Sequence, residues 1–198
     1  MTNQAIVPSR GNKIVRRPRS EVAKYQPKIE YLTDDEYVSL LSVTKKDEHK
    51  VLIQLLYQTG LRINEALTLT RGQLYPDCIN ILNGKGGKQR IVPCQQLLLG
   101  NLFRYQETHG QSRIFQKVTT EPGVLYMLRR YAKEINLGKR IHPHLFRHSF
   151  AINFLIQTGN PFSLQDIGGW ADMETIKIYM RLAKEQPREA IHRMRFPE

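Results

Sequence analysis

The sequence has few acidic residues, few cysteines and no long apolar run. Its 18 aspartates and glutamates are outnumbered by 30 lysines and arginines, so the formal net charge of the 198-residue chain is +12. A surface that only has to stay solvated does not need such an excess of positive charge, and we expect a polyanionic partner. Nucleic acid is the first candidate partner, and an anionic membrane surface is the second.

The other absences narrow the class of protein further. No apolar run has the length that a transmembrane helix needs, and the N-terminus lacks the apolar centre of a signal peptide. The two cysteines, Cys78 and Cys94, are too few for a secreted disulfide scaffold and favour a cytoplasmic protein with free thiols. The sequence shows neither an acidic ligand cluster nor a Cys/His metal spacing, so we predict no metal and no cofactor.

Residues 1–28 differ in composition from the rest of the chain. They hold seven lysines and arginines against one acidic residue, and three prolines interrupt any helix. We interpret this segment as a flexible basic arm, with an ordinary solvated terminus as the alternative. Its candidate nucleic-acid contacts are Arg10, Lys13, Arg16, Arg17 and Arg19. Residues 29–198 are then expected to form one globular unit.

The residue pattern of this globular part predicts mainly helices. Thr33 and Glu36 have the spacing of a capping box before a helix, and a second helix in HKVLIQLLYQTG should end at Gly60. A third, short helix is expected in LRINEALTL. Further helices are predicted near residues 95–108, 120–136, 144–158, 163–168, 172–182 and 187–195.

One segment interrupts the helical pattern. CINILNGKGGKQRIVP has two runs rich in β-forming residues around a glycine-rich turn, which predicts a β-hairpin. If the turn is centred on Gly86, Cys78 and Cys94 lie opposite each other. The predicted fold class is therefore mainly α with a small antiparallel sheet, an α+β fold.

Several polar residues stand where a helix or a turn would present them together. Arg62 and Glu65 are spaced i, i+3 in TGLRINEAL, and His144 and Arg147 have the same spacing in HPHLFRHSFA. Three basic residues lie in or beside the glycine-rich turn: Lys85, Lys88 and Arg90. That turn lacks the Walker phosphate-binding pattern. Taken singly, these features also fit a surface ion pair, a chance spacing and a soluble hairpin tip, and Tyr179 fits a packing residue.

The combination is more specific than any of its members. In chain order the residues are Arg62, Lys85, His144, Arg147, Trp170 and Tyr179. This set resembles the active-site signature of the tyrosine recombinase (phage integrase) family. TGLRINEAL is similar to the family's first arginine box, GKGGKQRIVP to its hairpin lysine segment, HPHLFRHSFA to its second box and DIGGWADMETIKIYMRLA to its closing tyrosine segment. The resemblance covers roughly residues 30–198 and implies the fold of the family's catalytic domain.

The resemblance implies a site-specific DNA recombinase in which Tyr179 is the nucleophile. Tyr179 would attack the scissile phosphate to give a 3′-phosphotyrosyl intermediate and a free 5′-hydroxyl, and religation would need neither ATP nor metal. Arg62 and Arg147 suit the non-bridging phosphate oxygens because each guanidinium can bind bidentately. His144 is expected to accept the tyrosine proton or to hold the phosphate, and Glu65 to orient Arg62 and His144.

A lysine and the tryptophan complete the expected site. Lys85 is our choice for protonating the leaving 5′-oxygen, with Lys88 in reserve. Lys88 and Arg90 are also expected to contact DNA. Many family members carry histidine where this chain has Trp170. The indole N–H can donate to a phosphate oxygen and the ring can buttress the tyrosine helix, but it cannot shuttle a proton.

The chain is short for the family, because many members carry a helical core-binding domain before the catalytic one. We therefore expect a catalytic-domain-only member that acts on double-stranded DNA with a specific site, in the cytoplasm and associated with the nucleoid. It would be a monomer in solution and a homo-tetramer on paired sites, with accessory DNA-bending proteins as a further class of partner. Two alternatives stay open: a nicking-closing enzyme similar to type IB topoisomerases, and a non-cleaving DNA-binding regulator on the same fold.

Overall fold

The computed structural model describes residues 29–82, 89–109 and 112–183. The basic arm 1–28, the turn residues Lys85 and Lys88, and the predicted helix 187–195 lie outside this part of the chain. In chain order the described elements are α1 (Asp34–Val43), α2 (Asp47–Thr59), α3 (Ile63–Leu67), a 3-10 turn (Arg71–Gln73), β1 (Cys78–Ile81), β2 (Arg90–Pro93), α4 (Gln96–His109), α5 (Glu121–Glu134), α6 (Pro143–Thr158), α7 (Pro161–Gly168) and α8 (Met173–Ala183). The predicted class, mainly α with a small antiparallel sheet, is confirmed.

Local sequence signals account for the ends of the first helices. The capping box before α1 is present, since the Thr33 main-chain N–H donates to Glu36 Oε2 (2.8 Å) and the Glu36 N–H donates to the Thr33 hydroxyl (3.3 Å). Gly60 ends α2 with a φ of 59°, and a Cβ there would lie 2.4 Å from the ring of Phe150 on α6. Only glycine meets both conditions, and the close approach brings the Gly60 carbonyl next to α6.

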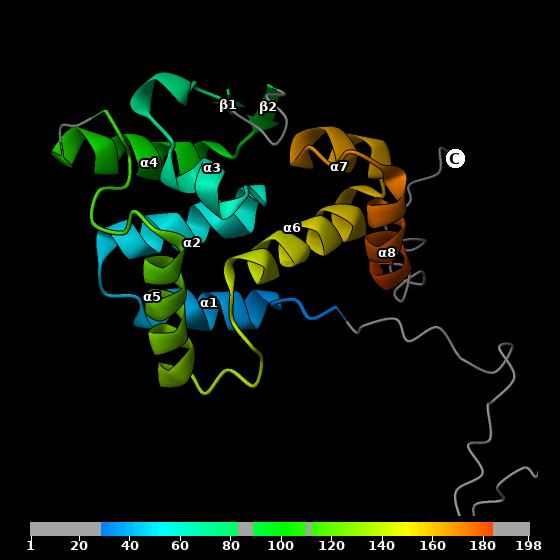
Figure 1. The fold of residues 1–198 in the computed structure, drawn as a ribbon, viewed down its shortest axis with the longest axis horizontal. Helices are drawn as coiled ribbons and strands as arrows, with labels where there is room; N and C mark the ends of the chain where they lie inside the picture. The colour runs from blue at the N-terminus through cyan, green and yellow to red at the C-terminus, as the bar shows by residue number, and fades with distance from the viewer. Residues whose placement is uncertain (1–28, 83–88, 110–111, 184–198) are drawn as a thin grey trace, which may run out of the picture.

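Helix α6 lies in the centre of the molecule and joins its two halves (Figure 1). It packs against α2 and against α8. Phe146 on α6 belongs to the large apolar cluster shared with α1 to α5, whereas Ile152 belongs to a smaller cluster with Leu164 of α7 and Ile176 of α8. Polar residues that lie between Phe146 and Ile152 in the sequence are therefore held at the junction of two cores.

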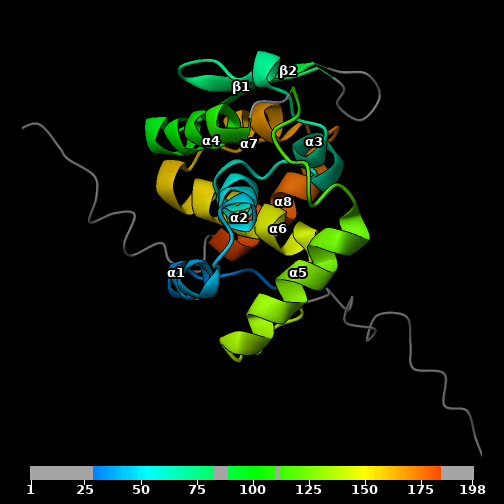
Figure 2. The ribbon, with the colours of Figure 1, turned by 90° about the vertical axis from the view of Figure 1, so that its left-hand side faces the viewer.

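The two-stranded sheet lies at an edge of the molecule, next to α4 and α7 (Figure 2). Its register pairs Cys78 with Pro93 and Ile81 with Arg90. The expectation that Cys78 faces Cys94 is therefore wrong by one residue. An even number of residues separates the paired residues Ile81 and Arg90. The centre of the hairpin in the sequence therefore lies between two residues and not on the expected Gly86. Both cysteines are free thiols.

The remaining predicted helices agree with α4 to α8 to within one or two residues at each end. A two-residue difference at α7 has a clear cause. The helix begins at Pro161 because Asn160 caps it: the Asn160 side chain accepts a hydrogen bond from the Ser163 N–H at 3.0 Å. Among the helices described, none is both long enough and apolar enough to cross a membrane.

Candidate active site

Tyr179 lies on α8 with its side chain almost buried, at 4% exposure. Its hydroxyl oxygen is 2.8 Å from Nδ1 of His148 on α6. Burial raises the pKa of the phenol above its ordinary value, and the charge of Arg147 opposes that rise. Such a phenol is a poor nucleophile until a neighbouring group takes its proton, and His148 is within reach to do so.

His148 is held neutral by its surroundings. Burial, together with the neighbouring His144, His142 and Arg147, lowers the pKa of its imidazole to about 4. At neutral pH the ring is therefore uncharged, and Nδ1 can accept the hydrogen of the Tyr179 hydroxyl while Nε2 carries the ring proton.

His144 does not hold this position. It is exposed in the first turn of α6, one helical turn before His148. The structure therefore places His148, and not the expected His144, beside the Tyr179 hydroxyl, while a phosphate-holding role for His144 stays a prediction. The spacing i, i+4 within HPHLFRHSFA was a usable signal that both histidines share a helix face. The sequence could not say which turn of α6 meets Tyr179.

Arg147 is almost buried, at 5% exposure, and main-chain carbonyls anchor it. Its Nη1 donates to the Gly60 carbonyl at 2.6 Å, and its Nη2 donates to the Gly168 carbonyl at 2.8 Å. Burial, together with the charge of Arg62, lowers the pKa of this guanidinium to about 10. Arg147 therefore remains charged at neutral pH although it is removed from water.

Arg62 reaches the same turn from the start of α3. Its Nη2 donates to the Gly169 carbonyl at 2.8 Å, and its Nη1 lies 3.1 Å from Glu65 Oε1. Because Gly168 and Gly169 are consecutive, their carbonyls bring the guanidinium groups of Arg147 and Arg62 close together. A guanidinium has five N–H donors, so these bonds do not exhaust either group, and both can also bind an anion.

Trp170 fills the space between Arg147 and Tyr179. The guanidinium carbon of Arg147 lies 3.9 Å from the centre of the indole, and the Tyr179 ring meets the indole edge-on at 5.8 Å between ring centres. Gly168 makes room for this ring, because a Cβ at that position would lie 1.7 Å from Cζ3 of Trp170. Gly169, with a φ of 65°, ends α7 and turns the chain. Packing against Trp170 thus explains the glycine at position 168, and the positive φ explains the glycine at position 169.

Glu65 is the acceptor at the centre of this network. It takes hydrogen bonds from the Arg62 main-chain N–H (2.8 Å) and from Nη1 and Nη2 of Arg90 (2.8 and 2.7 Å). Burial raises the pKa of the Glu65 carboxyl, but the bonds from Arg90 and Arg62 outweigh it and hold the pKa below its ordinary value. Glu65 thus contacts Arg62, and its other partner is Arg90 and not the expected His144.

Arg90 therefore differs from its expected role. A DNA contact would need its guanidinium at the surface, yet the side chain is only 9% exposed and points inward. Its Nε also donates to the Ile167 carbonyl at 2.8 Å. The expectation that Arg90 contacts DNA is corrected by this placement, because the fold brings a buried carboxylate within its reach.

The charges gathered here favour an anion. Three guanidinium groups and one carboxylate come together, and the members are Arg62, Arg90, Arg147 and Glu65. Of the sequence-predicted residues, the structure unites Arg62, Arg147, Trp170 and Tyr179, leaves His144 at the exposed edge, and does not describe Lys85. The surplus positive charge and the nearby hydroxyl are suited to a phosphodiester.

Comparison with known proteins shows the family to which the chain belongs. Residues 30–186 match the family model described as the phage integrase family. This chain belongs to the phage integrase family. It is similar to tyrosine recombinase XerA of Pyrococcus horikoshii, with 30% identity over 178 residues that cover 84% of this chain and 62% of the relative.

Solved structures of the family agree with the fold. A crystal structure of XerA recombinase superposes with a TM-score of 0.72 at 27% identity, covering 84% of this chain and 66% of that one. The catalytic domain of bacteriophage HP1 integrase has a TM-score of 0.67 at 23% identity, covering 84% of this chain and 95% of that domain, which shows the likeness of fold alone. The chain spans slightly less than two thirds of the length of the curated relatives it matches.

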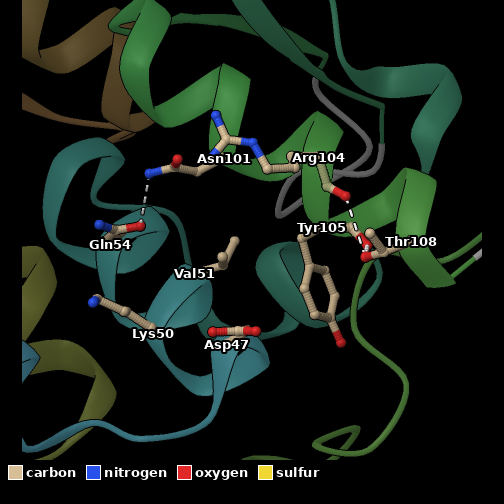
Figure 3. A pocket seen from close by; sticks show the side chains of 8 residues that line it. All are labelled: Asp47, Lys50, Val51, Gln54, Asn101, Arg104, Tyr105 and Thr108. Atoms are coloured by element: carbon tan, nitrogen blue, oxygen red, sulfur yellow. Dashed lines mark hydrogen bonds between the residues drawn. The ribbon is translucent and has the colours of Figure 1, made fainter.

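A cavity of about 410 Å³ lies elsewhere in this phage integrase family member, between α2 and α4 (Figure 3). Its lining residues are Asp47, Lys50, Val51, Gln54, Asn101, Arg104, Tyr105 and Thr108. The amide groups of Gln54 and Asn101 are joined across it by a 3.2 Å hydrogen bond. The residues around Tyr179, here called the tyrosine cluster, share no member with this cavity. They are Arg62, Glu65, Arg90, Arg147, His148, Trp170 and Tyr179.

Proposed function

We propose that this chain is the DNA-cleaving and rejoining unit of a site-specific recombinase. The observation that carries the proposal is the Tyr179 hydroxyl, which lies 2.8 Å from a neutral His148 and feels the charge of the anchored Arg147 guanidinium that lies over the Trp170 ring. Phosphodiester exchange needs an oxygen nucleophile, a proton acceptor and cationic groups for the developing charge, and these are the groups present.

In the proposed reaction, the Tyr179 oxygen attacks the scissile phosphorus as its proton passes to Nδ1 of His148. The bond between phosphorus and the 5′-oxygen breaks, and its electron pair leaves with that oxygen, which takes up a proton from Lys85. The products are a 3′-phosphotyrosyl bond and a free 5′-hydroxyl. Religation reverses these steps, and it needs no ATP because the phosphotyrosyl bond retains the energy of the phosphodiester.

Arg62 and Arg147 stabilise the transition state in this scheme. Negative charge accumulates on the non-bridging phosphate oxygens, and the carbonyls of Gly60, Gly168 and Gly169 hold both guanidinium groups in place before the substrate arrives. Loss of one such donor typically costs about 2.7–4 kcal/mol of transition-state stabilisation.

The low pKa of His148 fits a base that works only in the DNA complex. A pKa of about 4 makes the imidazole a weak proton acceptor in the free protein. Burial is the main cause of this low pKa and the neighbouring His144, His142 and Arg147 add to it, and a phosphate bound beside Arg62 and Arg147 opposes this second, electrostatic cause. In this proposal the charge of the bound phosphate favours transfer of the Tyr179 proton to His148.

The proposed partner is double-stranded DNA that carries a specific site. A tetramer would form on two paired sites from monomers in solution, in the cytoplasm and on the nucleoid, with DNA-bending proteins as accessory partners. In this proposal residues 29–198 form the catalytic unit and residues 1–28 follow the phosphate backbone. The excess of 30 basic over 18 acidic residues supports a polyanionic partner.

The test uses nicked DNA, from which a cleaved strand cannot be religated. A library of duplexes with random sequence and one nick is incubated with the protein, covalent adducts are isolated, and the trapped DNA is sequenced. We expect a 3′ adduct at a shared sequence, and we expect Tyr179→Phe to form none while it still binds the recovered duplex. An adduct formed by the Phe variant would falsify the assignment of the nucleophile.

The recovered duplex also separates the alternatives. Exchange of strands between two differently labelled copies indicates a recombinase. Relaxation of supercoiled DNA without exchange would indicate a nicking-closing enzyme, and binding without any adduct from the wild-type protein would indicate a regulator.

A further inference from the structure

Arg90 is a largely enclosed cation that joins three segments of the chain. It lies on β2, and its Nη1 and Nη2 donate to both carboxylate oxygens of Glu65 on α3. Its Nε donates to the Ile167 carbonyl at the end of α7. Gly169 in the following turn lies against its stem, since a Cβ there would be 3.1 Å from Cδ of Arg90. Through Arg90, β2 is therefore linked to Glu65 and to the end of α7. The same carboxylate and the Gly169 carbonyl just after α7 also bind Arg62.

The charges explain why a second arginine is needed on Glu65. Arg62, at 26% exposure, is the outer partner of the Glu65 carboxylate, and Arg90, at 9%, is the inner one. Without Arg90, the Glu65 carboxylate would pair with Arg62 alone. Its negative charge would then offset the positive charge with which Arg62 binds a phosphate. A bidentate pair with Arg90 satisfies the carboxylate and leaves the charge of Arg62 available.

We propose that Arg90 is a positioning residue for cleavage: it neutralises Glu65 and supports the turn whose carbonyls orient Arg62 and Arg147. The geometry sets this role apart from a DNA contact, because the Arg90 guanidinium is directed into the protein by three hydrogen bonds. The inference rests on the proposed cleavage reaction, but it concerns a residue that touches neither the nucleophile nor the phosphate.

The test compares Arg90→Gln and Arg90→Lys with the wild-type protein on the nicked duplex recovered above. We expect Arg90→Gln to lower the single-turnover rate of adduct formation at saturating DNA by roughly 10- to 100-fold, with little change in Kd. Arg90→Lys should fall between the two, because lysine carries charge but cannot form the fork to Glu65 and the bond to Ile167 together. Arg113→Gln, at an exposed arginine, is the control for the loss of one positive charge.

A double variant separates positioning from plain structural support. Glu65→Gln combined with Arg90→Gln removes the buried charge together with its partner, so it should cleave faster than Arg90→Gln alone. If Arg90→Gln does not fold, Arg90→Lys and the double variant decide the question in the same assay. Wild-type cleavage rates in Arg90→Gln, or a loss seen only in Kd and its salt dependence, would overturn the inference. Failure of the proposed function is a different result, because the wild-type protein itself would then form no adduct.

Discussion

The hydroxyl oxygen of Tyr179 lies 2.8 Å from Nδ1 of His148, although 31 positions separate the two residues in the chain. The tyrosine belongs to α8 and the histidine to α6, and these helices pack directly against each other. The proposed nucleophile is thus hydrogen-bonded to a residue whose charge changes with pH, and we expect both stability and cleavage to depend on the protonation of His148.

Acid should destabilise the protein through His148. Its pKa is about 4 in the folded protein and near 6.5 in the unfolded chain, so the unfolded state binds more protons between these values. The contribution of His148 to the free energy of unfolding is therefore full above about pH 6.5 and falls as the pH is lowered toward 4. Thermal melts of the wild-type protein and of His148→Gln across this range should show a smaller loss in the variant. Parallel curves would mean that other groups cause the acid sensitivity.

Cleavage should depend on the same imidazole. His148→Gln keeps a hydrogen-bonding side chain but no proton acceptor of comparable basicity, so adduct formation should slow by about 10²- to 10⁴-fold, the usual contribution of a general base. His144→Gln is the matched control on the exposed turn of α6. The rates are measured at saturating DNA. A larger loss in His144→Gln than in His148→Gln would return the proton-accepting role to His144.

Trp170 should act through its ring. Trp170→Ala uncovers Arg147 and removes the edge contact with Tyr179, and a desolvated cation–π contact is worth about 2 kcal/mol, or roughly 30-fold in rate if the transition state loses it fully. Trp170→His, which keeps an aromatic ring and an N–H donor, should retain substantial activity. Cleavage rates and melting temperatures of both variants are compared. An alanine variant that cleaves as fast as the wild type would show that the indole has no part in the reaction.

Gly168 should tolerate no side chain. The new Cβ of Gly168→Ala would overlap Cζ3 of Trp170, so the indole has to move away from Arg147. We expect a cost in stability of about 1–3 kcal/mol and slower adduct formation. Gly138→Ala is the control, since a Cβ there meets nothing within 4 Å. Equal behaviour of the two variants in melting and cleavage would contradict the packing of Trp170 described above.

The basic arm should contribute to DNA affinity and not to chemistry. Each phosphate neutralised adds about 0.9 to the steepness of log K against log salt, so deletion of residues 1–28 should flatten the slope by roughly 2.7–4.5 units if three to five cations engage. Adduct formation at saturating DNA should persist, because every residue of the tyrosine cluster lies after the deleted segment. The measurement is a salt titration of binding for the full chain and for residues 29–198. An unchanged slope would show that the arm makes no phosphate contacts.

Much of the fold follows from local signals in the sequence. The Thr33–Glu36 capping box, the left-handed Gly60 and the apolar spacing of the helices depend on residues a few positions apart, so they can be read without the fold. Arg62, Arg147, Trp170 and Tyr179 are identified by the joint resemblance of their four motifs to the family, since each motif taken singly also fits an ordinary surface or packing role.

The tertiary structure alone decided which residues meet. His148 and not His144 lies beside Tyr179. Which turn of α6 faces α8 depends on how the two apolar clusters pack around α6. Arg90 looks like a surface cation in the sequence, yet folding places it on Glu65, 25 positions away. Local patterns determine what each segment becomes, whereas contacts between distant segments follow from the packing of the whole chain.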